Sequence, residues 1–90
     1  MEFIHEGKAF RHYNAAGEMD AEITYASKGE GVIEANHTFV DSSLRGQGVA
    51  RQLVDRLADF ARDENLKIYP TCSYVVALFK KSTEYDDVKI

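Results

Sequence analysis

The 90-residue sequence contains no tryptophan, one proline and one cysteine. With Cys72 alone, the chain can form neither an internal disulfide nor a zinc site built only from cysteines. Long apolar runs are also absent, because the longest, Val75–Phe79, is far too short to span a bilayer. Residues 1–20 lack a signal-peptide pattern. A cytoplasmic, reducing location is therefore expected.

The remaining composition is that of an ordinary folded protein, with 44% hydrophobic and 29% charged residues. This length leads us to expect a single domain over residues 1–90, with a thin core. The formal net charge of -4 gives no general affinity for nucleic acid or for an anionic membrane. An anionic ligand would therefore have to be held by a local arrangement of donors.

Alternating polarity dominates the first forty residues. Apolar and polar side chains alternate over Met19–Tyr25, a pattern typical of a half-buried strand. Turn signals at Asn14–Gly17 and Lys28–Gly31 flank that segment. The pattern predicts four strands, at about 3–5, 8–13, 19–25 and 32–40. We expect these strands to form an antiparallel meander.

In the second half of the chain, apolar residues recur at helical spacing. The residues concerned are Ala50, Leu53, Val54, Leu57, Ala58 and Ala61. They predict an amphipathic helix over about Gln47–Glu64. Asn65 is suited to a left-handed position just after such a helix.

A short strand and a short helix are predicted after residue 65. Leu66–Thr71 is typical of a strand, but Pro70 cannot donate to a sheet ladder, so the strand lies at an edge or leaves its neighbour there. Ser73 is a candidate cap for a helix ending near Lys81, followed by a polar tail. The order predicts an α+β fold, in which the meander feeds a right-handed β-α-β unit and forms a mixed sheet.

The turn before the long helix carries the clearest chemical signal. Gly46 and Gly48 let a ligand approach the backbone, and the first helical N–H groups lack intrahelical partners. The helix dipole makes this end electropositive, and the forked side chain of Arg45 suits phosphate oxygens. Glycines before helices are common, so an ordinary solvated turn remains the alternative. The Gly-Lys-Ser/Thr of a P-loop is absent, and Arg51 stands where a dinucleotide fingerprint needs its third glycine.

The pattern Arg-x-x-Gly-x-Ala at Arg45–Ala50 resembles the coenzyme A pyrophosphate motif of the GNAT (Gcn5-related N-acetyltransferase) superfamily. More narrowly, the chain resembles a small single-domain branch of that superfamily. The further segments that carry the resemblance are His37–Val40, Leu44–Gly48, Pro70–Val75 and Glu84–Tyr85. Their common order makes the resemblance more specific than the turn alone.

The resemblance implies a minimal GNAT-like fold that ends in a short helix and binds acetyl-CoA. In the superfamily, main-chain groups of the strand before the turn contact the pantetheine arm, a role that falls on Phe39 and Val40, with Thr38 as a neighbour. The amides from Gly46 to Ala50 would face the pyrophosphate. The predicted cofactor-binding residues are Thr38, Phe39, Val40, Arg45, Gly46, Gln47, Gly48, Val49, Ala50 and Ser73.

Two departures from larger GNATs bear on catalysis. No N-terminal helical region is recognisable, although such helices commonly build the wall around the acceptor substrate. The tyrosine that usually protonates the departing thiolate is also not clearly present, because Phe79 and Lys80 occupy its neighbourhood. The acceptor is therefore left unspecified.

Acetyl transfer to an amine needs a base, because a lysine-like amine has a pKa of about 10.4. His37, Glu34 and a water molecule are the candidates. An ideal strand places His37 on the face of Ile33 and Ala35, and Glu34 on the opposite face, so at most one of the two is expected to serve. The alternatives are a histidine hydrogen-bonded in place and a solvated glutamate.

Cys72 is the other candidate catalytic residue. It follows Pro70, where the strand is expected to diverge and open a slot for the thioester, and it precedes a helix start, which favours a thiolate. The branch that the chain resembles carries a cysteine here, suspected of reacting with acetyl-CoA. Transfer through acetyl-Cys72 and a thiol that merely lines the pocket both remain open.

Together these features predict an acetyl-CoA-dependent N-acetyltransferase acting on a small amine or a protein amine. Transfer is direct or proceeds through Cys72. The alternative is a non-catalytic module that binds or senses acetyl-CoA or CoA. The histidines lack metal-ligand spacing, so no metal site is predicted. A nucleic-acid or membrane partner is not expected, and an exposed sheet edge allows a monomer or a weak dimer.

Overall fold

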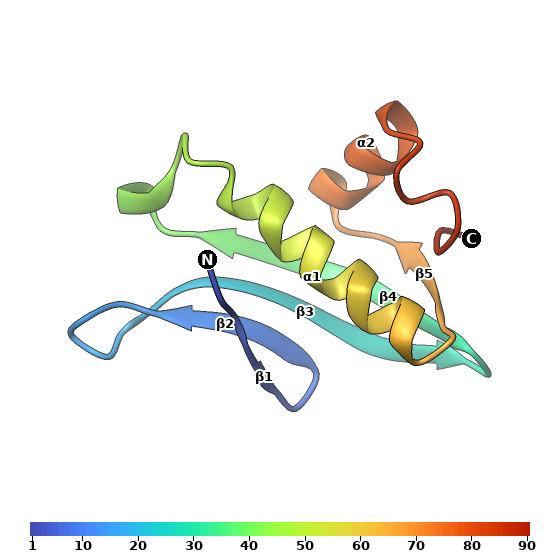
Figure 1. The fold of residues 1–90 in the computed structure, drawn as a ribbon, viewed down its shortest axis with the longest axis horizontal. Helices are drawn as coiled ribbons and strands as arrows, with labels where there is room; N and C mark the ends of the chain where they lie inside the picture. Colours follow the sequence, from blue (N-terminus) through green and yellow to red (C-terminus); the bar gives the residue numbers. More distant parts are fainter.

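The computed structural model describes residues 1–90 as a mixed five-stranded sheet with two helices (Figure 1). The elements are β1 (Ile4–Glu6), β2 (Ala9–Tyr13), β3 (Met19–Gly29), β4 (Val32–Val40), the 3-10 turn η1 (Ser42–Leu44), α1 (Val49–Asp63), β5 (Lys67–Pro70) and α2 (Ser73–Lys81). The first four strands pair antiparallel in chain order, and β5 pairs parallel with β4. The predicted α+β class with a mixed sheet is confirmed.

Most predicted elements occur within a few residues of their expected positions. β4 coincides with the predicted strand, whereas β3 continues beyond Tyr25 to Gly29. α1 begins at Val49 and not at Gln47, because Gly48 precedes it with a left-handed φ of 72° that helical residues do not adopt. Asn65 has the predicted left-handed backbone, with a φ of 56°.

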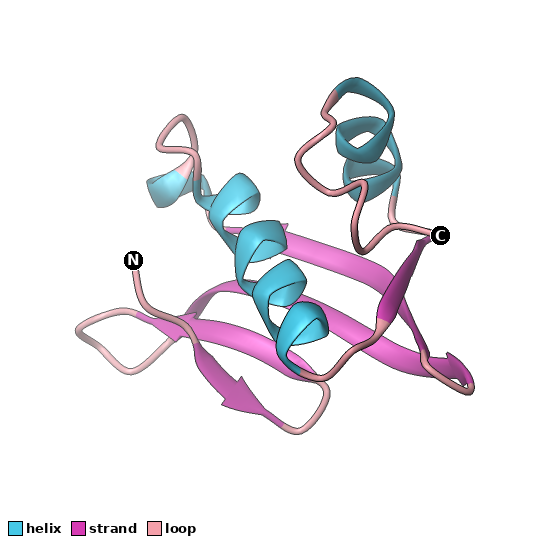
Figure 2. Ribbon diagram, turned by 45° about the vertical axis from the view of Figure 1, so that its right-hand side comes forward, coloured by secondary structure: helices cyan, strands magenta, loops and turns pink.

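Both helices contribute to one hydrophobic core on the same face of the sheet (Figure 2). The apolar stripe of α1 lies against Ile23, Ala35 and Ile68, which project from three neighbouring strands. α2 adds Val75, Leu78 and Phe79 to this core. No helix covers the other face of the sheet, which we call the open face.

The start of α2 differs from the prediction. Ser73 is its first helical residue, Cys72 is its N-cap, and no side chain forms a capping hydrogen bond. The amides of Thr71 and Cys72 both donate to the Ala35 carbonyl at 3.0 Å. These two bonds bend the chain away from β4 directly after Pro70, so the helix begins at Ser73. The predicted cap at Ser73 is therefore wrong.

The polar tail that follows α2, residues 82–90, packs onto the fold through two buried residues. Tyr85 and Val88 are 1% and 2% exposed, and the Tyr85 ring stacks on Phe79 with centroids 5.1 Å apart. The Ile68 amide donates to the Val88 carbonyl, and the Ile90 amide donates to the Ile68 carbonyl. The tail therefore covers the outer edge of β5 and leaves β1 as the exposed edge strand.

Neither helix of the structure has the length and apolar character needed to cross a bilayer. No three side chains of His, Cys, Asp or Glu lie close enough together to hold a metal ion.

Candidate functional site

The sheet opens where β4 and β5 separate. Their pairing ends at Ala35 opposite Pro70, which has no N–H to continue the ladder. β4 continues to Val40 without a partner on that side. The Asp41 amide donates to the Asp20 carbonyl of β3. Because backbone groups alternate in direction along a strand, those of Thr38 and Val40 point away from β3 and into the opening.

A β-bulge in β4 decides which side chains border this opening. Thr24 pairs with His37 and Tyr25 pairs with Ala35, which leaves Asn36 as an extra residue. The bulge reverses the alternation beyond it, so that Thr38 shares the helix-covered face with Ile23.

The prediction that His37 and Glu34 lie on opposite faces is therefore wrong. His37 pairs with Thr24, and Glu34 pairs with Ala26, and both of these β3 residues project from the open face. An ideal period of two does not hold across an inserted residue.

On the helix-covered side, a cavity of about 320 Å³ joins the opening to the glycine turn. Its lining residues are Thr38, Val40, Leu44, Arg45, Gly46, Gly48, Val49, Ala50, Arg51 and Tyr74. The cavity thus brings together most of the predicted cofactor-binding residues. Phe39, Gln47 and Ser73 do not line it.

The glycine turn presents a row of free donors to this cavity. None of the backbone N–H groups from Gly46 to Arg51 has an acceptor in the chain, and the first amide of α1 that is bonded is that of Gln52, to the Gly48 carbonyl at 3.1 Å. Gly46 and Gly48 have φ values of 82° and 72°, and a Cβ built on either would have no heavy atom within 4 Å. The turn is therefore open and electropositive, as an anion site requires.

Side chains before the helix hold this turn in place. Asp41 accepts hydrogen bonds from the amide and hydroxyl of Ser43, at 3.0 and 2.7 Å, and these bonds lower the pKa of its carboxyl group. Arg45 donates through Nε to the Val40 carbonyl at 3.4 Å. Gln47 donates to the Ser43 carbonyl at the same distance and lies outside the cavity.

Cys72 lies beside the inner end of the cavity. Its Sγ is 3.4 Å from the Oγ1 of Thr38, which lines the cavity. Burial of the thiol raises its pKa. The hydrogen bonds from the Thr38 hydroxyl and from the backbone N–H groups of Val75, Tyr74 and Thr38 together lower the pKa by more, so it lies below its ordinary value. The structure thus combines a half-buried thiol with an environment that favours the thiolate.

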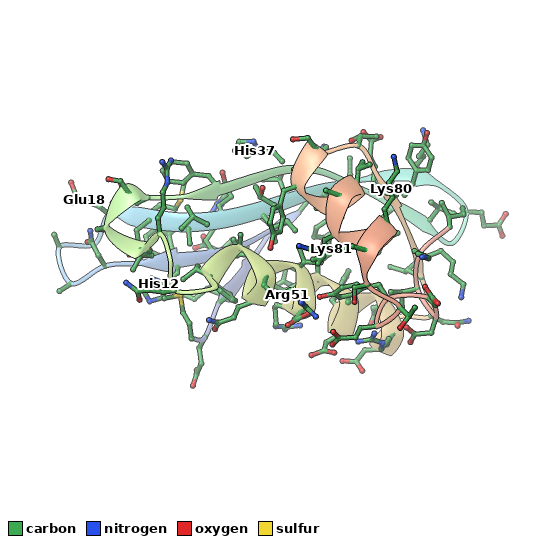
Figure 3. The ribbon with its side chains drawn as sticks, turned by 90° about the horizontal axis from the view of Figure 1, so that it is seen from above. His12, Glu18, His37, Arg51, Lys80 and Lys81 are labelled. Atoms are coloured by element: carbon green, nitrogen blue, oxygen red, sulfur yellow. The ribbon has the colours of Figure 1, made fainter.

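His37 projects from the opposite side of the sheet from Arg51 (Figure 3). Its Nε2 atom is 3.8 Å from Oε2 of Glu22, and its side chain is 57% exposed. Glu22 also accepts a hydrogen bond from Arg11 Nε at 2.7 Å. Because His37 and Thr38 are adjacent and point to opposite faces, the opening has the imidazole on one side and Cys72 on the other.

Three cavity residues, Leu44, Arg51 and Tyr74, are absent from the predicted cofactor-binding residues. Arg51 falls on the polar face of the amphipathic helix, where a solvated residue is the usual interpretation. Tyr74 follows Ser73 in the first turn of α2. Leu44 and Tyr74 lie in segments that carry the family resemblance, whereas for Arg51 the only signal is its place near the predicted helix start.

Comparison with known proteins identifies a shared family and fold. A family model described as GCN5-related N-acetyl-transferase matches residues 9–88. A GCN5-like protein from Staphylococcus aureus, solved by NMR, is 32% identical and superposes with a TM-score of 0.84, covering 99% of this chain and 87% of its own. A Mycobacterium tuberculosis protein crystallised in complex with CoA shares the fold, with a TM-score of 0.57 and 23% identity over 68% of this chain and 39% of its own.

Curated relatives of this chain include the NATD1 proteins of Gallus gallus and Homo sapiens. Each is 32% identical over 62 residues, which is 69% of this chain. The chain spans 56% and 55% of the lengths of these two relatives.

Proposed function

The chain belongs to the GCN5-related N-acetyltransferase family, and from this premise we propose that it binds acetyl-CoA and transfers the acetyl group to an amine. The observation that carries the proposal is the continuous cavity that runs from the free amides of the glycine turn to Thr38, beside Cys72. In this proposal residues 1–90 act as one acetyl-CoA-binding domain.

Cofactor binding follows from the donors of the cavity. The pyrophosphate would be held by the amides from Gly46 to Ala50 and by Arg45, which offer N–H groups and one positive charge. The pantetheine arm would lie along Thr38 and Val40, whose backbone groups lack a strand partner on the β5 side. The thioester would then reach the opening beside Cys72.

Direct transfer is one chemical route from this arrangement. An amine approaching from the open face attacks the thioester carbonyl, its proton passes to His37 or to water, and the bond between carbon and the CoA sulfur breaks. The CoA thiolate then takes up a proton. The exposed imidazole of His37 is on the side from which the amine would approach.

Transfer through Cys72 is the other route. Its thiolate attacks the same carbonyl and CoA leaves as a thiolate that takes up a proton, giving acetyl-Cys72. The amine then attacks this second thioester and releases the cysteine. The lowered pKa of the Cys72 thiol supports this route.

A non-catalytic module that binds or senses acetyl-CoA is the second candidate. The observation that favours it is the open face of the sheet, where no helix builds a wall around an acceptor next to His37. An acceptor or a partner protein could itself cover this face.

Calorimetric titration with acetyl-CoA tests the binding proposal. We expect saturable binding that weakens strongly in Arg45→Glu, because the substitution replaces a cation at the cavity by an anion. Lys8→Glu makes the same charge change between β1 and β2 and should bind like the wild type. Equal affinity in all three proteins would contradict the pyrophosphate assignment.

Release of CoA across a panel of amines and peptides separates enzyme from module. If the chain is an enzyme, we expect CoA release to depend on an acceptor. If direct transfer operates, we expect that release to fall in His37→Gln. For the covalent route, intact-protein mass after incubation with acetyl-CoA should show one added acetyl group, which is lost in Cys72→Ala. Full turnover in Cys72→Ala would eliminate that route, whereas binding without turnover for any acceptor would favour the module.

A further inference from the structure

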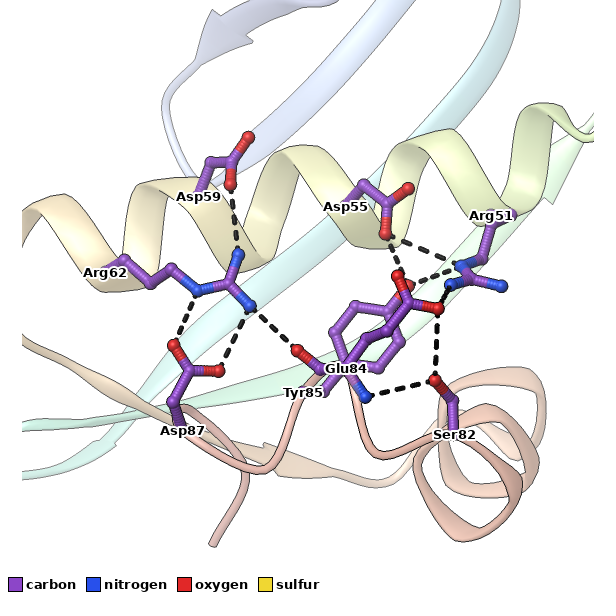
Figure 4. A network of polar contacts seen from close by, with 8 residues as sticks. All are labelled: Arg51, Asp55, Asp59, Arg62, Ser82, Glu84, Tyr85 and Asp87. Carbon is purple, nitrogen blue, oxygen red and sulfur yellow. Dashed lines mark hydrogen bonds and ion pairs between the residues drawn. The ribbon is translucent and has the colours of Figure 1, made fainter.

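The C-terminal tail holds Arg51, an arginine in the first turn of α1, by two polar contacts (Figure 4). Arg51 donates through Nε to the Tyr85 hydroxyl at 2.6 Å and through Nη2 to the Glu84 carboxylate. The Tyr85 hydroxyl in turn donates to Asp55, one turn further along α1. The guanidinium is therefore fixed by groups that come from both the helix and the tail.

Tyr85, which holds Arg51, is itself fixed in place by packing. Tyr85 is 1% exposed, its ring stacks on Phe79, and the guanidinium carbon of Arg51 lies 5.4 Å from the ring centroid. Arg62, about three turns beyond Arg51 on α1, ties Asp87 and the Glu84 carbonyl to the helix. The tail is thus anchored on both sides of Tyr85.

Arg51 nevertheless keeps part of its hydrogen-bonding capacity free. A guanidinium carries five N–H donors, and the two contacts with the tail use Nε and Nη2. The Nη1 atom has no partner in the chain, and Arg51 lines the same cavity as the free amides of Gly46 and Gly48. A held arginine with one free edge beside free amides is the arrangement expected of an anion ligand.

We propose that Arg51 is a second cationic ligand for the phosphates of the cofactor, and that Glu84 and Tyr85 are positioning residues that hold it toward the cavity. This inference rests on the proposed binding of acetyl-CoA. It makes the C-terminal tail part of the cofactor site, although the tail itself does not line the cavity. Because the tail fixes the guanidinium before binding, less side-chain freedom remains to be lost when the phosphate arrives.

A purely structural ion pair is the competing explanation, and the chain contains a matched example of one. Arg62, which lies on the same helix as Arg51, pairs with Asp87 of the tail at 2.7 Å, also through Nε and Nη2. Arg62 does not line the cavity. Variants of Arg62 and Asp87 therefore reproduce the charge change and the loosening of the tail, while every side-chain contact of Arg51 stays in place.

The experiment compares the affinities of acetyl-CoA and of S-acetylpantetheine, which lacks every phosphate, for the whole chain. Arg51→Gln should bind acetyl-CoA about tenfold more weakly, the scale of one lost charge-assisted hydrogen bond, and should bind acetylpantetheine as the wild type does. Arg51→Lys keeps the charge but not the fork, and should fall between the two proteins. Arg62→Gln and Asp87→Asn should leave both affinities unchanged.

Tyr85→Phe tests the positioning role, because it removes the hydroxyl that fixes Arg51 and leaves the net charge unchanged. Its affinity for acetyl-CoA should fall several-fold, again without an effect on acetylpantetheine. Circular dichroism on each variant verifies that the chain is folded at the titration temperature.

Two results would overturn the inference alone: wild-type acetyl-CoA affinity in Arg51→Gln, or an equal loss for both ligands. Loss of affinity in Tyr85→Phe that Asp87→Asn reproduces would overturn the positioning role. Failure of the wild-type chain to bind acetyl-CoA would instead overturn the proposed function, and this inference with it.

Discussion

A methyl group added at Gly48 gives a sharp test of the glycine turn. Gly48 has a φ of 72° and precedes α1, and Gly31 has a φ of 74° in the turn between β3 and β4. A Cβ at either position would meet no heavy atom within 4 Å. In the free protein, both substitutions to alanine therefore cost backbone strain and nothing else.

The size of that strain follows from the left-handed backbone. A residue with a Cβ pays about 1–2 kcal/mol there, and the stiffer unfolded chain returns about 0.4–1 kcal/mol. We expect each variant to lose about 1 kcal/mol of unfolding free energy. For a chain of this length, such a loss lowers the Tm by about 4–8 °C. Urea and thermal unfolding followed by circular dichroism measure both quantities.

The two variants should differ only in cofactor binding. The methyl group of Gly48→Ala stands among the free amides and holds a phosphate away from them, whereas Gly31 lies between strands far along the chain from the turn. We expect acetyl-CoA to bind Gly48→Ala at least about tenfold more weakly, or about 1.4 kcal/mol, and to bind Gly31→Ala as it binds the wild type. Calorimetry well below the Tm gives these affinities. Equal affinities for both variants would refute the assignment of the turn as a phosphate site.

Three further predictions concern single side chains. Thr38→Val removes a group that lowers the pKa of Cys72, so alkylation of the thiol by iodoacetamide should shift to higher pH, and an unchanged pH profile would contradict the contact. Leu57→Ala truncates a fully buried side chain and should lower the unfolding free energy by about 2–5 kcal/mol in urea melts. Asp87 has its pKa lowered by Arg62, so the pair stabilises the fold above the unfolded pKa of about 3.9, and the contribution is lost as pH falls through the lower folded pKa. The unfolding free energy of Asp87→Asn should therefore change less on acidification than that of the wild type.

Local sequence patterns were sufficient for the predicted elements of this fold. The alternation at Met19–Tyr25 and the helical spacing from Ala50 to Ala61 each report one segment and the face that it buries. The bulge at Asn36 was not predictable in this way, because it depends on how β4 pairs with β3. The packing of the tail was not predictable for a related reason, since Tyr85 is a lone aromatic residue in a polar stretch and only tertiary packing buries it.

The residues of the candidate site also fall into those that local sequence signals predict and those that only the tertiary structure brings together. Gly46, Gly48 and Arg45 were predictable because helix-end chemistry is local in the sequence. The cavity also needs Arg51 from the polar side of α1 and Tyr74 from a second helix, and no single segment carries that information. The resemblance to a family provided the order of these segments but not the contact between the tail and Arg51.

The spatial order of the strands, identical to their order in the chain, also bears on how the molecule folds. Each strand of the meander can pair with the one just made, across a short loop that closes at little entropic cost. The parallel pairing of β4 with β5 must wait for α1 to cross between them, and the bonds from Ile68 to the tail form only after β5 is in place. We therefore expect the β2–β4 meander to be ordered in the folding transition state and the tail to dock last.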